Sequence, residues 1–167
     1  MRKEIFRQFI ILTAISQGIL GCNSGQNDSS VPVYYQQIIG IMAQNGELSN
    51  DLVELTGALF SGSNSEEAAS TLQSQIIPLA NQLATAARGL TTTNPTIAAS
   101  HEYLIEGWTQ RQESYTEMLQ AYRSSDLALF ESASDKADLA RDNEERYFSE
   151  INTFLAPYGL YVVQHPE

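Results

Sequence analysis

Four long stretches of this chain place apolar residues alternately three and four positions apart, and no other feature restricts the fold as strongly. One face of an α-helix returns about every 3.6 residues, so this spacing forms an apolar seam along one side of a helix. The seams cover residues 32–60, 65–90, 95–123 and 126–156. No stretch shows the sustained alternation that marks a half-buried strand. The sequence therefore predicts an all-α protein.

Helix caps and helix breakers indicate where these helices begin and end. Asn94 followed by Pro95 places a favoured N-cap residue before a proline in the first turn. Residues 63–66 (Ser-Asn-Ser-Glu) fit a capping box, and Pro157 and Gly159 end the last seam. Because the loops between the seams are short, neighbouring helices should run antiparallel, which predicts an up-down-up-down four-helix bundle.

Two further details of this bundle are predicted. Pro78 lies inside the second seam and lacks a backbone donor, so a kink is expected there. After the last helix, residues 160–163 are apolar enough to fold back onto the end of the bundle. The bundle domain would then cover residues 32–163, and residues 164–167 would form a frayed tail.

The chain is acidic, and its charge limits the partners that it can have. Its 167 residues suggest one domain, and its formal net charge is −11. Residues 1–21 contain three basic residues and one acidic residue, so the remainder has a net charge of −13. A surface this acidic repels phosphate backbones and anionic lipids. We therefore exclude nucleic acid and electrostatic binding to membranes, whereas a basic partner would fit.

The chain begins with a short basic segment and an apolar run. Arg2, Lys3 and Arg7 precede the mostly apolar residues 9–19. This run is shorter than the roughly 20 apolar residues that a permanent membrane span needs. A secretory signal peptide over residues 1–21 is therefore the better interpretation.

The apolar run ends at Ile19-Leu20-Gly21-Cys22, which contains the only cysteine of the chain. An aliphatic residue, a small residue and then cysteine at these positions resemble the lipobox of bacterial lipoproteins. The resemblance implies cleavage between Gly21 and Cys22, diacylglycerol on the Cys22 sulfur, and an acyl chain such as palmitate on the new amino group. An ordinary secretory signal with a chance cysteine is the alternative. If the chain is a lipoprotein, residues 22–31 are the lipidated cysteine and a flexible polar tether.

Asn23, the residue after this cysteine, bears on the destination of the protein. In enteric bacteria an aspartate there favours retention in the inner membrane, so the resemblance implies the outer membrane, on its periplasmic or surface face, in a Gram-negative cell. In other cells it implies the outer face of the plasma membrane. The expected partners are the membrane, through the lipid on Cys22, and an unidentified protein of the cell envelope.

Three polar residues, Asn45, Arg111 and Glu144, occupy seam positions that should face the core. Counted from the turn near residue 125, Glu144 lies about five residues further from the turn than Arg111, roughly 7 Å along the helix. Side chains lean toward the N-terminus of their helix, so the two charged groups approach each other in an antiparallel pair. Asn45 falls near the same level. A buried structural layer, a ligand site and a position on the rim are the three interpretations.

The third seam also contains His101, Trp108, Tyr115 and Tyr122. Core packing, with tyrosine hydroxyls at the rim, explains the aromatic residues, and a groove for an aromatic or apolar ligand is the alternative. His101 is likewise either a hydrogen-bonded core residue or a ligand for a metal or non-covalent haem.

The sequence contains no motif for covalent haem, di-iron, zinc-protease, serine-hydrolase or phosphate-loop chemistry. The mixed charges of residues 135–146, which include the pairs Asp138–Arg141 and Asp142–Arg146, are typical of a solvated helix face. They fit a calcium site poorly, because no loop presents the oxygens together. We therefore expect no catalytic residues, no metal and no cofactor.

The third and fourth helices, from His101 to the Tyr-Gly-Leu at residues 158–160, also resemble the helical domains of bacterial lipoproteins of unknown function. No site residue is transferred from that resemblance. We expect a membrane-anchored lipoprotein whose bundle is a structural or protein-interaction module without catalysis. A small-ligand-binding or sensory bundle, with its site between the third and fourth helices, is the alternative hypothesis.

Overall fold

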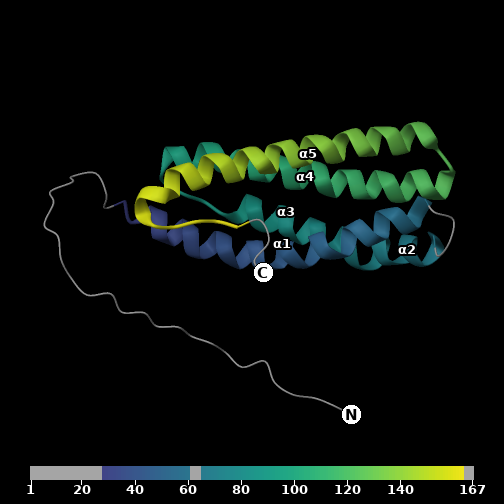
Figure 1. The fold of residues 1–167 in the computed structure, drawn as a ribbon, viewed down its shortest axis with the longest axis horizontal. Coiled ribbons are helices and arrows are strands. Elements are labelled where there is room, and N and C mark those ends of the chain that lie inside the picture. The colour runs from purple at the N-terminus through teal and green to yellow at the C-terminus, as the bar shows by residue number, and fades with distance from the viewer. Residues whose placement is uncertain (1–27, 61–64, 164–167) are drawn as a thin grey trace, which may run out of the picture.

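The computed structural model describes residues 28–60 and 65–163, and this part of the chain is mostly helical. Helices α4 and α5 form one layer, and α1, α2 and α3 form the other (Figure 1). The π-helical turn η1 joins α2 and α3 without a break, so these three segments together make one long helix. The predicted all-α four-helix bundle is confirmed. The elements are α1 (Ser30–Phe60), α2 (Ser65–Thr71), η1 (Leu72–Ile76), α3 (Ile77–Gly89), α4 (Pro95–Ser124), α5 (Leu127–Leu155) and the 3-10 turn η2 (Ala156–Tyr158).

Several predictions concern residues outside the described ranges. These are the signal peptide over residues 1–21, Cys22 with most of the tether, the loop at 61–64 and the tail at 164–167. Among the helices that are described, none combines the length and the apolar character needed to span a membrane.

Helices α4 and α5 form an antiparallel hairpin with a tight turn. Ser125 adopts a left-handed conformation with φ of 53° and caps the C-terminus of α4. Asp126 then caps α5, because its side chain accepts a hydrogen bond from the backbone N–H of Leu129 at 3.1 Å. Further from the turn, the Ser114 hydroxyl donates to the Ala133 carbonyl oxygen at 2.7 Å, which ties the two helices side by side.

Helix α1 runs in the same direction as α4. Near the start of both helices the Tyr34 hydroxyl bonds to His101, and further along both helices Asn45 bonds to Arg111. The N-termini of α1 and α4 therefore lie at one end of the bundle, where α5 ends (Figure 1). We call this the tethered end, because the described chain begins here at residue 28 and the predicted tether from Cys22 would join it at this point.

Two capping residues connect the first turns of α1 and α4. The Asp28 carboxylate accepts hydrogen bonds from the Ser30 N–H and hydroxyl at 2.9 and 2.6 Å. Asn94, the predicted N-cap of α4, accepts from the N–H groups of Thr96 and Ile97 at 2.9 and 3.0 Å. Its amide also donates to Asp28 at 2.7 Å. These bonds, from Ser30 first and then Asn94, lower the pKa of Asp28.

The second helix changes its winding beside its proline. Near Pro78, where a kink is predicted, the helix contains the π-helical turn η1, which ends two residues before this proline. Pro78 has no N–H to donate to the carbonyl of Ser74. The backbone N–H of Ile77 bonds instead to the carbonyl of Leu72, five residues earlier. The extra residue in this turn lets the helix continue past the proline.

Small residues line the contact between α4 and α5 and allow a close approach. Gly107 is the tightest point, since a Cβ atom there would lie 3.0 Å from both the Ala140 carbonyl oxygen and the Cγ of Glu144. A larger residue here would force these neighbouring atoms to shift by a few tenths of an ångström. The other buried small residues along this contact are Ser100, Ser114 and Ala121 on α4 and Ala133 and Ala140 on α5.

The tail after α5 folds back along the tethered end, as its apolar sequence predicts. Val162 is buried in the main core. The Asn152 side chain holds its backbone on both sides, accepting from its N–H at 2.7 Å and donating to its carbonyl at 2.9 Å. The Tyr35 hydroxyl donates to the carbonyl of Tyr161 at 3.1 Å, so the tail connects α5 with α1.

Candidate functional site

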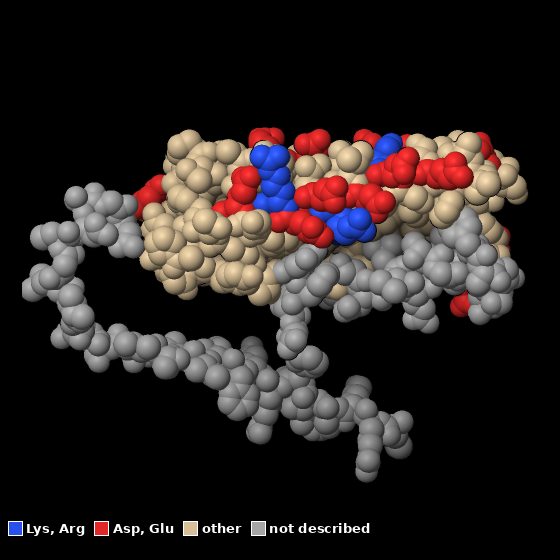
Figure 2. Space-filling view, turned by 45° about the horizontal axis from the view of Figure 1, so that its top comes forward, with Lys and Arg blue, Asp and Glu red and all other residues tan. Residues whose placement is uncertain are grey.

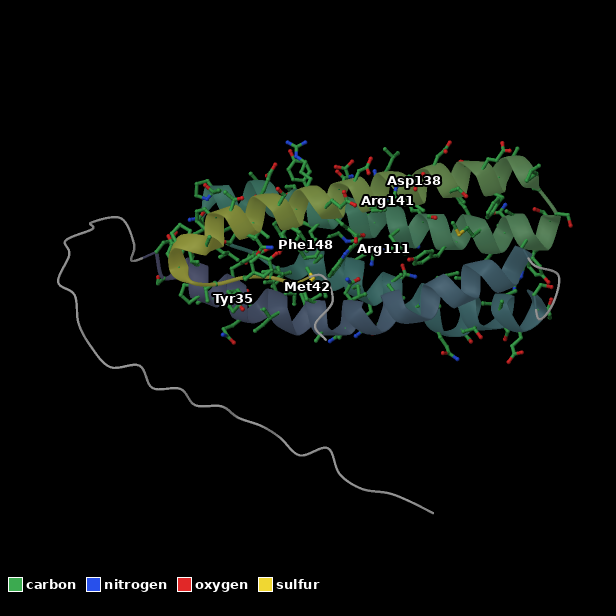
Figure 3. The ribbon with its side chains drawn as sticks, viewed as in Figure 1. Tyr35, Met42, Arg111, Asp138, Arg141 and Phe148 are labelled. Atoms are coloured by element: carbon green, nitrogen blue, oxygen red, sulfur yellow. The ribbon has the colours of Figure 1, made fainter. Side chains whose placement is uncertain are left out.

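The structure brings Asn45, Arg111 and Glu144 together in the interior, and we call these three residues the ionic layer. The Arg111 guanidinium forms an ion pair with Glu144 Oε2 and donates through Nη1 to Asn45 Oδ1 at 2.6 Å. The side chain of Glu144 is only 1 % exposed and that of Arg111 14 % exposed. Arg111 lies between the two helix layers in Figure 3. The layer therefore joins α1, α4 and α5 through one buried cation.

Gly107 positions the carboxylate of this layer. Because α4 has no side chain at this point, the stem of Glu144 packs directly against the α4 backbone one turn before Arg111. The second carboxylate oxygen, Glu144 Oε1, is buried and has no hydrogen-bond partner among the described residues. Arg111 is therefore the main compensation for this buried negative charge.

A second buried polar group lies at the tethered end and consists of Tyr34, His101 and Tyr147, which we call the tyrosine–histidine cluster. The Tyr34 hydroxyl lies 2.9 Å from His101 Nδ1 and 2.9 Å from the Tyr147 hydroxyl. His101 Nε2 lies 2.8 Å from the carbonyl oxygen of Ala87. The Tyr34 and His101 rings meet edge to face, with centroids 5.5 Å apart. The cluster connects α1, α3, α4 and α5.

The direction of each hydrogen bond in this cluster follows from Ala87. A carbonyl oxygen only accepts, so His101 Nε2 carries the proton and donates it to Ala87. In the neutral ring, Nδ1 then accepts from the Tyr34 hydroxyl. The Tyr34 oxygen in turn accepts from Tyr147. Ala87 belongs to the last turn of α3, and its carbonyl oxygen also accepts from the backbone N–H of Leu90 at 3.1 Å, so His101 is a second donor to this C-terminal carbonyl.

Burial keeps all three members of this cluster neutral near pH 7. It lowers the pKa of His101 below its usual value of 6.5, although the bond to Ala87 opposes this effect. Burial also raises the pKa of Tyr34 and Tyr147 well above that of a free tyrosine. Both ring nitrogens of His101 are engaged in hydrogen bonds, which is the geometry of a satisfied core histidine. Within the described ranges, no cluster of three or more His, Cys, Asp or Glu residues is placed to hold a metal ion.

The four residues predicted for a ligand groove are spread along α4. His101 and Tyr122 are separated by roughly 30 Å at the rise of a helix. Trp108 is 2 % exposed in the core, and its indole N–H has no hydrogen-bond partner among the described residues. Burial raises the pKa of Tyr115 to about 12, against the nearby positive charge of Arg111. The Tyr122 hydroxyl bonds to Ser65 Oγ at 3.1 Å, near the far end of the bundle.

Two surface hollows lie near that far end, around the turn between α4 and α5. One has a volume of about 350 Å³ and the other about 270 Å³. Tyr122 is the one predicted groove residue that lines either of them. The first is lined by Thr116, Leu119, Gln120, Arg123 and Ser124, and the second by Ala121, Tyr122, Ser125, Asp126, Leu127 and Phe130.

The outer faces of α4 and α5 carry mixed charges, which Figure 2 shows as interleaved acidic and basic side chains. The predicted pair Asp138–Arg141 is present at 3.1 Å. Arg146 does not pair with Asp142 as predicted, and bonds instead to Glu150 at 2.9 Å. Its guanidinium carbon also lies 3.9 Å from the centre of the Tyr103 ring, and this stacking holds the side chain beside Glu150.

The sequence did not identify two residues that organise these sites. Tyr34 lies within the first apolar seam, over residues 32–60, and nothing in the local sequence indicates that its hydroxyl reaches His101. Gly107 has a recognisable signal, since it belongs to a series of small residues spaced seven apart on α4: Ser100, Gly107, Ser114 and Ala121. Such a series marks a helix face that a neighbouring helix approaches closely.

Both polar groups are thus internal to the bundle and connect its helices. Their role is therefore inferred from the residues and contacts of this chain. No family model matches it, and no curated protein or solved structure is significantly similar to it.

Proposed function

We propose that this protein is a membrane-anchored lipoprotein whose helical bundle is a non-catalytic structural or protein-interaction module of the cell envelope. The observation that carries this proposal is Cys22, the only cysteine, placed where the apolar run of the leader ends after Gly21. Two or three acyl chains on this residue form a stable anchor, because each buried methylene contributes about 0.8 kcal/mol.

The chemistry of the core supports a structural role for the bundle. Both nitrogens of His101 bond within the protein, to Tyr34 and to Ala87. The Arg111 guanidinium bonds to Asn45 and Glu144. Polar groups that bind one another across helices stabilise one arrangement of the bundle, as polar seam residues do in coiled coils.

The proposed location is the outer membrane in a Gram-negative cell, since Asn23 and not aspartate follows the cysteine. In other cells the proposed location is the outer face of the plasma membrane. The bundle would be held there by the lipid on Cys22 and would contact a protein of the envelope. Crosslinking in cells followed by mass spectrometry would identify that protein.

The anchor is tested by replacing its attachment atom. In a Cys22→Ala variant we expect loss of incorporated palmitate analogue and either release from membranes or accumulation of the uncleaved precursor. A Ser24→Ala variant, two residues further along the tether, serves as the control and should behave like the wild type. Normal processing and membrane fractionation of Cys22→Ala would contradict the proposal.

A small-ligand site between α4 and α5 is the second candidate function. The Trp108 indole N–H and Glu144 Oε1 favour it, because both atoms are buried without a hydrogen-bond partner in the described part of the chain. The first atom is a donor on α4 and the second an acceptor on α5, which are the two kinds of group that a small polar molecule between these helices would bond. Native mass spectrometry of protein purified from its own membranes tests this, since a retained ligand adds a defined mass that a Trp108→Phe variant should lose.

A further inference from the structure

Charged residues are nearly absent from the segments that meet at the tethered end. Residues 29–46, 89–101 and 151–163 contain no Asp, Glu, Lys or Arg. Hydrogen bonds bring these segments together, from Tyr34 to His101 and from Tyr35 to Tyr161. In Figure 2 most of the visible charged side chains lie further along the bundle, over α4 and α5, and some acidic atoms are also visible at this end. Apart from Asp28, which caps the first turn of α1, these segments carry none of the many acidic residues of the domain.

The same end exposes large apolar side chains. Tyr161 is 61 % exposed and Val163 44 % exposed in the tail, and Val33 is 57 % exposed in the first turns of α1. The burial of Val162 explains the orientation of its neighbours, because side chains of an extended segment point alternately to opposite sides. Asn152 fixes this arrangement by bonding the Val162 backbone on both sides. The outward direction of Tyr161 and Val163 is therefore built into the fold.

The tether is short compared with the bundle. Six residues lead from Cys22 to Asp28, and at full extension they reach at most about 20 Å. Helix α1, with its 31 residues, is roughly 45 Å long at the rise of an α-helix. Asp28 is itself bonded to Ser30 and Asn94, so the rigid part of the protein starts where the tether stops. A lipid on Cys22 would hold the tethered end close to the bilayer.

We propose that the tethered end rests on the lipid surface, with Tyr161, Val163 and Val33 in contact with the headgroup region. This inference rests on the proposed lipid anchor at Cys22. Tyrosine suits this location, because its ring is apolar and its hydroxyl stays hydrated. Bacterial membranes carry anionic lipids, and an end with few charged residues approaches them with less repulsion than the acidic faces of α4 and α5 would. The bundle then projects from the membrane with its far end exposed to partners.

Single cysteines that report contact with lipid test this orientation. Tyr161→Cys and Val33→Cys probe the tethered end. Leu127→Cys and Leu139→Cys are matched controls, since Leu127 is 70 % exposed and Leu139 is 55 % exposed on other parts of the bundle. Each full-length variant is purified with its lipid, labelled with a fluorophore and reconstituted into vesicles of phosphatidylethanolamine and phosphatidylglycerol. Lipids with a nitroxide near the headgroup then quench fluorophores that touch the membrane.

We expect severalfold stronger quenching at positions 161 and 33 than at positions 127 and 139. Equal and weak quenching at all four positions would overturn the proposed contact, and strong quenching only at 139 would show that the bundle lies on its flank instead. Flotation of the same vesicles tests the lipid anchor independently of the contact between the tethered end and the membrane. Protein that floats without quenching at the tethered end retains its anchor and lacks the contact, whereas protein that does not float contradicts both proposals. Circular dichroism of each variant verifies that the helical fold is retained.

Discussion

The ionic layer and the tyrosine–histidine cluster both connect α1 to the α4–α5 hairpin, but they do so with different chemistry. In the layer a buried cation bridges a carboxylate and an amide. In the cluster every group is neutral, and the hydrogen bonds run from Tyr147 through Tyr34 and His101 to a backbone carbonyl. The two groups lie roughly 15 Å apart along α4, at the rise of a helix. The bundle is therefore joined at two levels, one ionic and one neutral.

The difference matters because an unpaired buried charge destabilises a protein more than an unpaired hydroxyl does. Removing one partner of a buried ion pair typically costs about 3 to 5 kcal/mol, whereas a buried neutral group without its partner costs about 1 to 3 kcal/mol. The ionic layer should therefore respond more strongly to single substitutions. The five predictions below rank the two groups and their surroundings by free energy of unfolding, measured in soluble protein made with Cys22→Ser.

The largest effect is expected from breaking the ion pair on one side. Glu144→Leu leaves the Arg111 charge buried without its main partner and should lower the free energy of unfolding by about 3 to 5 kcal/mol. The double variant Arg111→Leu, Glu144→Leu removes both charges and should lose less than Glu144→Leu alone. Urea denaturation of the four proteins of this cycle measures the coupling. If Glu144→Leu and Arg111→Leu each leave the free energy of unfolding unchanged, the ionic layer is solvated and the buried ion pair is contradicted.

The second-largest effect is expected from a substitution at the close contact between α4 and α5 that positions Glu144. Gly107→Ala places a methyl group 3.0 Å from the Ala140 carbonyl and from the stem of Glu144, so these atoms of α5 must shift by a few tenths of an ångström. We expect a loss of about 1 to 3 kcal/mol, typical of overpacking. Gly40→Ala is the control, because a Cβ there meets nothing within 4 Å and alanine favours a helix by about 1 kcal/mol. Equal effects at both positions would contradict the tight contact.

A smaller effect is expected in the neutral cluster. Tyr34→Phe removes the hydroxyl that donates to His101 and accepts from Tyr147, and leaves both groups without this partner. We expect a loss of about 1 to 2 kcal/mol. Tyr35→Phe, the next residue, removes only the hydroxyl that bonds the tail and should lose less. Thermal denaturation compares the two variants, and a larger loss in Tyr34→Phe than in Glu144→Leu would reverse the ranking of the clusters.

The cluster should also make the protein sensitive to mild acid. His101 has a lowered pKa in the folded state, so as the pH falls below about 6.5 the unfolded chain takes up a proton first. Stability contributed by neutral His101 is thus complete above this pH and decreases toward the lower, folded pKa. Urea denaturation at about pH 7.5 and at about pH 5.5 should show this loss of stability in the wild type and a smaller loss in His101→Gln. An unchanged pH dependence in His101→Gln would contradict the assignment.

The smallest effect is expected on the charged outer face. Arg141 and Asp138 form an ion pair in which the side chains are 61 % and 64 % exposed. Solvent screening leaves such pairs little net energy, so Arg141→Ala should change stability by no more than about 0.5 kcal/mol. A loss as large as that of Tyr34→Phe would mean that this surface is covered by another molecule under the conditions of the measurement.

Much of the fold could be predicted because helices are formed by local contacts. The three-and-four spacing predicted the all-α bundle, and Asn94 before Pro95 predicted the start of α4. The meeting of Arg111 and Glu144 was predicted by counting from the turn between their helices, since a two-helix hairpin allows few registers. The predicted pairing of Arg146 with Asp142 was wrong, since Arg146 bonds to Glu150 and its guanidinium also stacks on Tyr103 of the neighbouring helix. A ring contributed by another helix has no signature in the local spacing of charges.

By itself, the sequence determined which segments are helical, which faces are apolar and where a lipid anchor is predicted. These properties depend on residues within a few positions of each other. Only the tertiary structure decided that Tyr34 reaches His101, that Gly107 lets Glu144 approach α4, and that three uncharged segments meet at the tethered end. The reason is that such contacts depend on the rotation and separation of whole helices, which the packing of all their side chains sets together.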